Sequence, residues 1–272
     1  MRRSHCLFLL VFLLIQPSFD AAPLLAQSVL SGQVQISPPG HGTPLASASA
    51  KELEQTADLM RARKSYLDAL DYYQAAIAKT PAASASRLYN KAGIVELELQ
   101  RYRQAGKDFN HAIKADRQSA DAYNNLGVVD YLEKKNGKAL KQYKKAIQLS
   151  GSSASFYSNL AAAYFSRKEF EAATVAYAKA LQLDPDIFEH TSINGVAGRI
   201  SSPQDQAHYD YVVAGLYAKS GNLTRSLEYL RRAMEEGYKG VKDVYKDPEF
   251  TALRKDARFT ALMASKPPAI PE

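Results

Sequence analysis

A set of small and aromatic residues recurs every 34 residues in this chain, and this period constrains the fold more than any other feature. Five columns keep the step: Ala105, Ala139 and Ala173; Phe109, Tyr143 and Tyr177; Ala112, Ala146 and Ala180; Tyr89, Tyr123 and Tyr157; and Gly93, Gly127 and Ala161. Such a period predicts an array of equivalent units in which each unit packs against its neighbours.

Each unit predicts two helices that pack against each other. In residues 154–185, apolar residues at spacings of three and four place Tyr157 on the packed face of a first helix and Tyr177 on that of a second. The small residues Ala161 and Ala173 let the two backbones approach closely, which predicts an antiparallel pair. Pro185 ends the second helix because it cannot continue the hydrogen-bond ladder.

Two sequence runs carry a family resemblance. YNNLGVVDY in residues 123–131 and FEAATVAYAKALQLDP in residues 170–185 resemble the tetratricopeptide repeat. The resemblance implies an all-α fold, an α-solenoid of about five tetratricopeptide helix pairs with C-terminal capping helices. Four repeats are expected in 50–187, beginning at about 50, 86, 120 and 154, and a fifth, degenerate repeat in 207–240.

The remaining segments predict parts outside the repeats. Residues 188–206 form an irregular insert, which is either a spacer or a loop on a binding face. In 241–265, Asp247 with Pro248 and then Asp256 are typical helix starts, and the short helices that follow are expected to cap the array. The Pro-rich tail, 266–272, is expected to be disordered.

The N-terminus predicts export. Arg2 and Arg3 precede an apolar run from Cys6 to Ile15, and Pro17 and small residues follow. This order is typical of a signal peptide over 1–26, with cleavage near Ala26 and a soluble periplasmic or secreted product. The alternative is an uncleaved anchor. Residues 27–49, rich in Ser, Gly, Pro and Ala, are expected to form a flexible linker.

The charge of the exported part argues against nucleic acid as a partner. Removing residues 1–26 leaves 33 basic and 27 acidic residues, a net charge of +6, and no cysteine. An exported cationic chain meets anionic envelope surfaces before it meets DNA.

The family resemblance also implies a peptide-binding groove lined by the first helix of every pair. By analogy, the groove residues expected here are Arg87, Asn90, Lys91, Asn124, Asn125, Val128, Tyr131, Ser158, Asn159 and Phe165. Asn125 and Asn159 are equivalent residues one repeat apart, and an amide both donates and accepts hydrogen bonds. They predict a clamp on a peptide backbone, or, equally, amides that satisfy a turn or a neighbouring helix.

A basic stripe predicts a second surface. Lys134, Lys138, Lys141 and Lys145 recur at spacings of four, three and four, so they share one helix face, and Lys135 and Lys144 widen it. The stripe is either an ordinary solvated face or a surface attracted to anionic lipid or polysaccharide.

No motif for catalysis is present in the sequence. The five histidines show no HExxH or HxH spacing, and no phosphate-binding loop or nucleophile elbow occurs. A metal site at the insert, near His190 and His208, is the remaining enzymatic alternative. The sequence therefore predicts a non-enzymatic exported scaffold without cofactor or metal, which binds a protein or peptide in its groove. An envelope-associated assembly factor held by its basic face is the second hypothesis.

Overall fold

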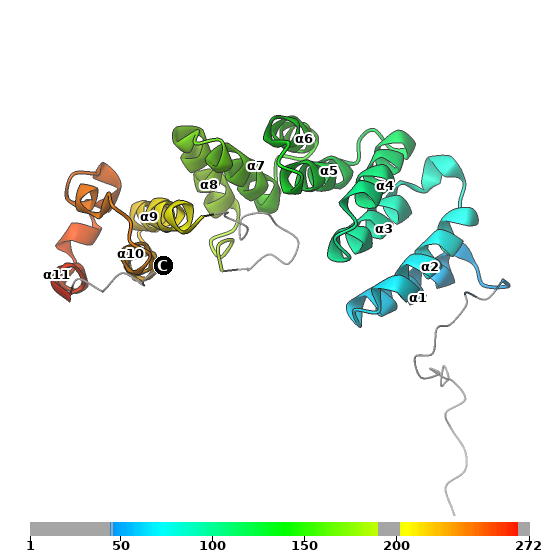
Figure 1. Cartoon of the computed structure of the whole chain (residues 1–272), viewed down its shortest axis with the longest axis horizontal. Helices are drawn as coiled ribbons and strands as arrows, with labels where there is room; N and C mark the ends of the chain where they lie inside the picture. The colour runs from blue at the N-terminus through cyan, green and yellow to red at the C-terminus, as the bar shows by residue number, and fades with distance from the viewer. Residues whose placement is uncertain (1–43, 45, 190–201, 266–272) are drawn as a thin grey trace, which may run out of the picture. The chain divides into compact units, whose positions relative to one another are not determined.

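The computed structural model describes residues 44, 46–189 and 202–265, and every regular element in these ranges is helical. Ten α-helices form five consecutive pairs (Figure 1). The pairs are α1 Ala50–Ala62 with α2 Tyr66–Ala78, α3 Ser86–Glu98 with α4 Tyr102–Ala115, α5 Ala120–Leu132 with α6 Asn136–Leu149, α7 Ala154–Ser166 with α8 Phe170–Leu183, and α9 Pro203–Lys219 with α10 Leu223–Glu235. The predicted all-α repeat fold is confirmed. α9 begins four residues before the expected start of the fifth repeat.

Small residues hold the two helices of each pair close together. Ala105, Ala139 and Ala173 are completely buried at equivalent positions of α4, α6 and α8. An ideal Cβ placed on Gly127 would lie 2.6 Å from a ring carbon of Tyr143, and the same addition at Gly93 would meet the Phe109 ring at 2.6 Å. The aromatic ring of the second helix therefore rests directly on the backbone of the first.

The turn between the two helices of a pair has the same geometry in all five repeats. A residue with left-handed backbone follows each first helix: Lys64, Gln100, Lys134, Lys168 and Gly221, with φ between 58° and 86°. In the third repeat, Lys135 N–H donates to the carbonyl of Asp130 (2.8 Å), and the other four repeats contain the equivalent bond. This is the Schellman arrangement, which satisfies carbonyls at a helix end and reverses the chain.

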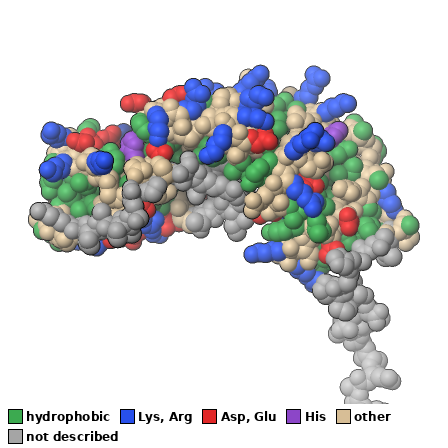
Figure 2. All heavy atoms as spheres, in the orientation of Figure 1, with side chains coloured by type: hydrophobic (Ala, Val, Ile, Leu, Met, Phe, Trp, Pro, Cys, Tyr) green, Lys and Arg blue, Asp and Glu red, His purple; other side chains and the backbone are tan. Residues whose placement is uncertain are grey.

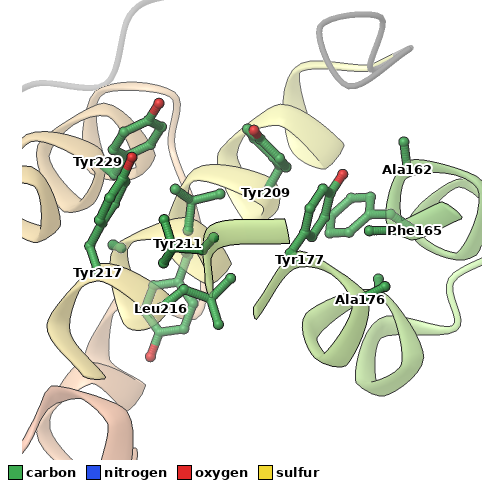
Figure 3. Close-up of a cluster of buried hydrophobic side chains, with 14 of the residues drawn as sticks. Ala162, Phe165, Ala176, Tyr177, Tyr209, Tyr211, Leu216, Tyr217 and Tyr229 are labelled. Atoms are coloured by element: carbon green, nitrogen blue, oxygen red, sulfur yellow. The ribbon is translucent and has the colours of Figure 1, made fainter. Parts of the chain in front are cut away.

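An aromatic cluster joins the fourth helix pair to the fifth. The chain between the two pairs, residues 190–201, lies outside the described ranges. The rings of Tyr177 and Tyr209 are 5.5 Å apart, and Phe165 lies 6.3 Å from Tyr209. Figure 3 shows these three rings gathered where α7, α8 and α9 meet. The fifth helix pair therefore packs as part of the array, although the sequence of that repeat is degenerate.

The residues after α10 cover the end of the fifth pair. They form η2 Val241–Tyr245, η3 Pro248–Phe250, η4 Leu253–Lys255 and α11 Ala257–Ser265. A further short 3₁₀ turn, η1 Ala82–Ser84, lies elsewhere in the chain, between α2 and α3. Phe250, Leu253, Phe259 and Leu262 are buried in the core of the last repeats. The first elements are 3₁₀ turns rather than the short helices expected. The Asp247 carboxylate does not cap the turn that follows it but accepts a hydrogen bond from the Tyr211 hydroxyl.

Candidate functional site: the face of the first helices

Charged side chains connect the first helices of repeats one and two. Lys91 Nζ on α3 lies 2.7 Å from Glu54 Oε1 and 2.6 Å from Asp58 Oδ2, both on α1, and Arg87 donates to the other Glu54 oxygen at 2.7 Å. The Tyr73 hydroxyl also donates to Asp58 (2.6 Å). Burial raises the pKa of Asp58, but the bonds from Lys91 and Tyr73 outweigh it and hold that pKa below its usual value.

Four asparagines continue this connection through repeats two to four. Asn159 Nδ2 on α7 donates to Asn124 Oδ1 on α5 (3.0 Å), Asn124 donates to Asn125 (3.1 Å), and Asn125 donates to Asn90 on α3 (3.0 Å). The two bonds between repeats join residues 35 apart, one more than the period. We call this set the amide chain. The amides of Asn159, Asn124 and Asn125 all donate in the same direction, toward Asn90.

Several predicted groove residues are covered by neighbouring helices. Asn124, Val128, Tyr131, Ser158, Asn159 and Phe165 are all buried. Phe165, for example, packs against Phe170 and Tyr209, because α8 of its own repeat and α9 of the next repeat cover that flank of α7. In this structure Asn125 and Asn159 bind side chains of neighbouring helices, as the second of the two interpretations states, while a peptide contact stays a prediction.

Arg87, Asn90, Lys91 and Asn125 keep contact with solvent, and two of them line a hollow of about 450 Å³. The Arg87 side chain is 73% exposed at its rim. The lining is Ala83, Ser84, Ser86, Arg87, Asn90, Ala115, Asp116, Ser119 and Asp121. Four of these nine residues, Ala83, Ser84, Asp116 and Ser119, belong to the turns between repeats, which sequence reasoning missed because no column of the repeat distinguishes them. We call this space the first-helix hollow.

The predicted basic stripe lies on the second helix of repeat three. α6 holds four lysines, Lys138, Lys141, Lys144 and Lys145, and no acidic residue. Lys134 and Lys135 lie in the turn before it, where Lys135 pairs with Glu133 at 2.6 Å. Figure 2 shows Lys and Arg side chains gathered along the edge of the molecule to which α6 belongs.

Two carboxyl groups meet between α9 and the end of α10. Asp210 is only 2% exposed, and the amide of Gln206 donates to it at 3.3 Å. Burial and the charge of Glu236 raise the pKa of Asp210 to about 7, and burial also raises the pKa of Glu236. The two groups therefore favour sharing a proton near neutral pH.

Replacing Asp210 with Asn is expected to stabilise the protein at pH 8. The folded state binds more protons than the unfolded state between pH 4 and 7, so the stability contributed by the protonated pair is lost as pH rises through that window. We expect a gain of about 1–3 kcal/mol in the free energy of unfolding at pH 8 and little change at pH 4.5. Urea unfolding at both values measures it. Asp205→Asn is the control, because Lys168 pairs with Asp205 and its removal brings no gain. A loss of stability in Asp210→Asn at pH 8 would contradict the assignment.

The described residues contain no cluster of three or more His, Cys, Asp or Glu side chains able to hold a metal ion. His190 lies outside these residues. His208 is half-buried among aromatic rings. Its ring centroid lies 4.3 Å from that of Phe170 and 5.3 Å from that of Tyr238, and burial lowers the pKa of its imidazole. Within the same residues no helix has the length and apolar character needed to span a membrane.

Comparison with known proteins agrees with this architecture. Models of the tetratricopeptide repeat match residues 86–119 and 154–187, and a TPR repeat model matches residues 129–166. No curated protein sequence matches the chain. The solved structure of pilF from Pseudomonas aeruginosa is 16% identical, with 80% of this chain and 88% of that one covered and a TM-score of 0.52.

Two other similar structures have lower TM-scores. MamA from Desulfovibrio magneticus RS-1 is 19% identical, with 69% of this chain and 94% of that one covered and a TM-score of 0.49. YrrB, described as a TPR protein with an unusual peptide-binding site, is 20% identical, with coverages of 80% and 92% and a TM-score of 0.47. The models match residues 86–119 and 129–187, and together with the five helix pairs they show tetratricopeptide repeats in these residues within an all-helical α-solenoid.

Proposed function

We propose that this chain is a non-enzymatic, exported scaffold that binds a protein or peptide partner on the face formed by its first helices. The observation that carries the proposal is the first-helix hollow, where exposed hydrogen-bonding groups lie at the end of the amide chain. The buried part of that chain holds the first helices in register, so the exposed end is pre-organised. Binding to a rigid surface costs less conformational entropy than binding to a mobile one.

The direction of the amide chain indicates what the hollow binds. Asn90 Oδ1 accepts from Asn125, and Asn90 Nδ2 makes no hydrogen bond to any described residue. Together with the exposed Arg87 guanidinium, it offers donors to a peptide carbonyl or carboxylate. Asp116 and Asp121 on the other wall offer acceptors to peptide N–H groups. An extended peptide backbone carries both kinds of group.

The test is a binding measurement with peptides selected for binding to the full chain from a random 12-residue library. We expect Arg87→Ala combined with Asn90→Ala to weaken peptide affinity by about tenfold or more, since hydrogen bonds to charged groups contribute roughly 1.5–3 kcal/mol each. The matched control is Asn110→Ala with Lys114→Ala, which removes one amide and one cation from the exposed side of α4 in the same repeat. Fluorescence anisotropy measures affinity, and circular dichroism confirms folding. Equal losses in both variants would reject this face as the binding site.

Export is part of the same proposal, and it rests on the basic and apolar pattern of residues 1–26. The chain recovered from an exporting host is expected to start near Gln27 or Ser28 and to remain soluble. An intact Met1 in the membrane fraction would show that the segment acts as an anchor.

A second candidate function is attraction to an anionic envelope surface through α6. The observation in its favour is the charge of the second helices: α6 carries four lysines without an acidic residue, whereas α2 carries two aspartates and no basic residue. Among the second helices of the five pairs, α6 therefore has the largest excess of basic over acidic residues. Such attraction is screened over about 8–10 Å at physiological salt, so it acts at close range.

A further inference from the structure

The outer side of the third repeat carries an open hollow of about 720 Å³. Its lining is Tyr123 from α5 and Lys141, Gln142, Lys144, Lys145 and Gln148 from α6. We call it the α6 hollow. Its volume lies within the range of small-ligand sites. It combines one aromatic ring, two amides and three ammonium groups, and no carboxylate lines it.

The second repeat shows what fills the equivalent place elsewhere in the array. Tyr89, one period before Tyr123, stacks on His111 with ring centroids 5.0 Å apart and planes inclined by 24°. The residue one period after His111 is Lys145, which is not aromatic. Among the described residues no ring packs against Tyr123. Tyr89 and Tyr123 are both half-buried, but of these two only Tyr89 has, among the described residues, a second ring stacked on it.

The three lysines of the α6 hollow occur together in this repeat alone among the five. At the position of Lys141 the other repeats hold Asp71, Lys107, Val175 and Glu228. At the position of Lys144, repeats two and four hold Asn110 and Ala178. The repeat fold therefore does not require three lysines at these positions, because no other repeat holds more than one, although repeat five holds Arg231 and Arg232 at the positions of Lys144 and Lys145. The set of three lysines is therefore a property of the third repeat and not of the helix-pair pattern that all five repeats share.

No acidic side chain in the described part of the chain forms an ion pair with the ammonium groups of the hollow. Lys145 Nζ donates to Gln148 Oε1 at 3.2 Å, and Lys144 Nζ lies 5.3 Å from the centre of the Tyr164 ring. Within the described part of the chain, Lys141, Lys144 and Lys145 form no ion pair with Asp or Glu. The hollow thus presents three uncompensated positive charges around an aromatic ring.

We propose that the α6 hollow binds a segment of acidic polysaccharide. This inference rests on the second candidate function and gives it a site and a ligand class. A sugar ring has an apolar C–H face that suits the Tyr123 ring, hydroxyl groups that suit the amides of Gln142 and Gln148, and, in a uronic acid, a carboxylate that suits the lysines. The lysines require a ligand of negative charge, while the Tyr123 ring and the amides of Gln142 and Gln148 favour a sugar.

The shape of the site distinguishes this ligand from two other anions. A lipid bilayer offers a broad surface of headgroups, and attraction to it depends on the lysines rather than on a ring inside a hollow. A peptide made only of Asp and Glu offers carboxylates but no ring to lie on Tyr123. Dependence of binding on Tyr123 is therefore the property that marks the polysaccharide.

The experiment is calorimetric titration of the full chain with hexagalacturonate, and with uncharged maltohexaose for comparison. We expect binding of the acidic oligomer alone. Lys141→Gln with Lys144→Gln and Lys145→Gln should weaken it about tenfold or more, and Tyr123→Leu by about threefold to tenfold. The matched control is Arg103→Gln with Lys107→Gln and Lys114→Gln, which removes the same charge from α4 and should change affinity less than twofold. Circular dichroism verifies that each variant is folded.

Three results would overturn the inference: no binding of hexagalacturonate, equal weakening in the two triple variants, or no effect of Tyr123→Leu. Titration with phosphatidylglycerol vesicles and with hexa-aspartate separates the inference from the candidate function on which it rests. If vesicles or hexa-aspartate bind through the lysines while hexagalacturonate does not, attraction to anionic surfaces stands and the polysaccharide site is rejected. If none of the three binds, both are rejected.

Discussion

Replacing Phe250 with Ala is expected to lower the free energy of unfolding by about 3–5 kcal/mol, the usual cost of removing a buried aromatic side chain. Phe250 is 1% exposed, its ring centroid lies 5.2 Å from that of Tyr211, and its ring carbons approach the backbone of Gly215 on α9. Truncation leaves a cavity between η3 and the fifth pair. Urea unfolding followed by circular dichroism measures the loss.

The control for this prediction is Val175→Ala on α8, where the side chain is 72% exposed and the expected change is within about 0.5 kcal/mol. A helix pair at the end of a solenoid exposes the apolar face that the next repeat would cover, so the terminal unit needs a cap. If Phe250→Ala and Val175→Ala destabilise equally, residues 241–265 do not act as that cap.

Sequence reasoning predicted the helix pairs because their packing depends on contacts within one period. Tyr143 and Ala139 lie on one helix and Gly127 on its partner, so residues near in sequence supply both sides of the contact. The turns within the pairs were harder to predict. Gly is the usual signal for the left-handed residue of a Schellman turn, and it occurs in the fifth repeat as Gly221, whereas Lys64 and Lys134 occupy that position elsewhere.

The amide chain was predicted less completely than the pairs because it depends on how one repeat sits against the next. The sequence columns align Asn125 with Asn159 at a step of 34, but the bonds form between residues 35 apart, so Asn125 binds Asn90 and Asn159 binds Asn124. The burial of the predicted groove residues could not be predicted from the sequence for the same reason, because it also depends on how one repeat packs against the next. Phe165 is covered by residues of α8 and α9, which no single repeat contains.

Gly127→Ala is expected to destabilise the protein by about 1–3 kcal/mol, although Ala is the better helix former. The new Cβ would lie 2.6 Å from the Tyr143 ring, and Tyr143 is completely buried, so α5 and α6 must move apart. The matched control is Gly137→Ala in the first turn of α6, where an added Cβ meets no atom within 4 Å and helix propensity predicts a gain of up to about 1 kcal/mol.

The two glycine substitutions make the same chemical change on the two helices of one pair, so their opposite signs isolate the packing contact from backbone entropy. Ala161 occupies the Gly127 position one repeat later, which shows that the fold admits a Cβ in this column when the facing helix is placed for it. After a single substitution at Gly127, α5 and α6 cannot move apart without disturbing other contacts, because α5 also packs against α4 and α6 also packs against α7. Thermal or urea unfolding of both variants measures the difference. Stabilisation by both substitutions would show that the α5–α6 pair is packed less closely than its ring and backbone positions indicate.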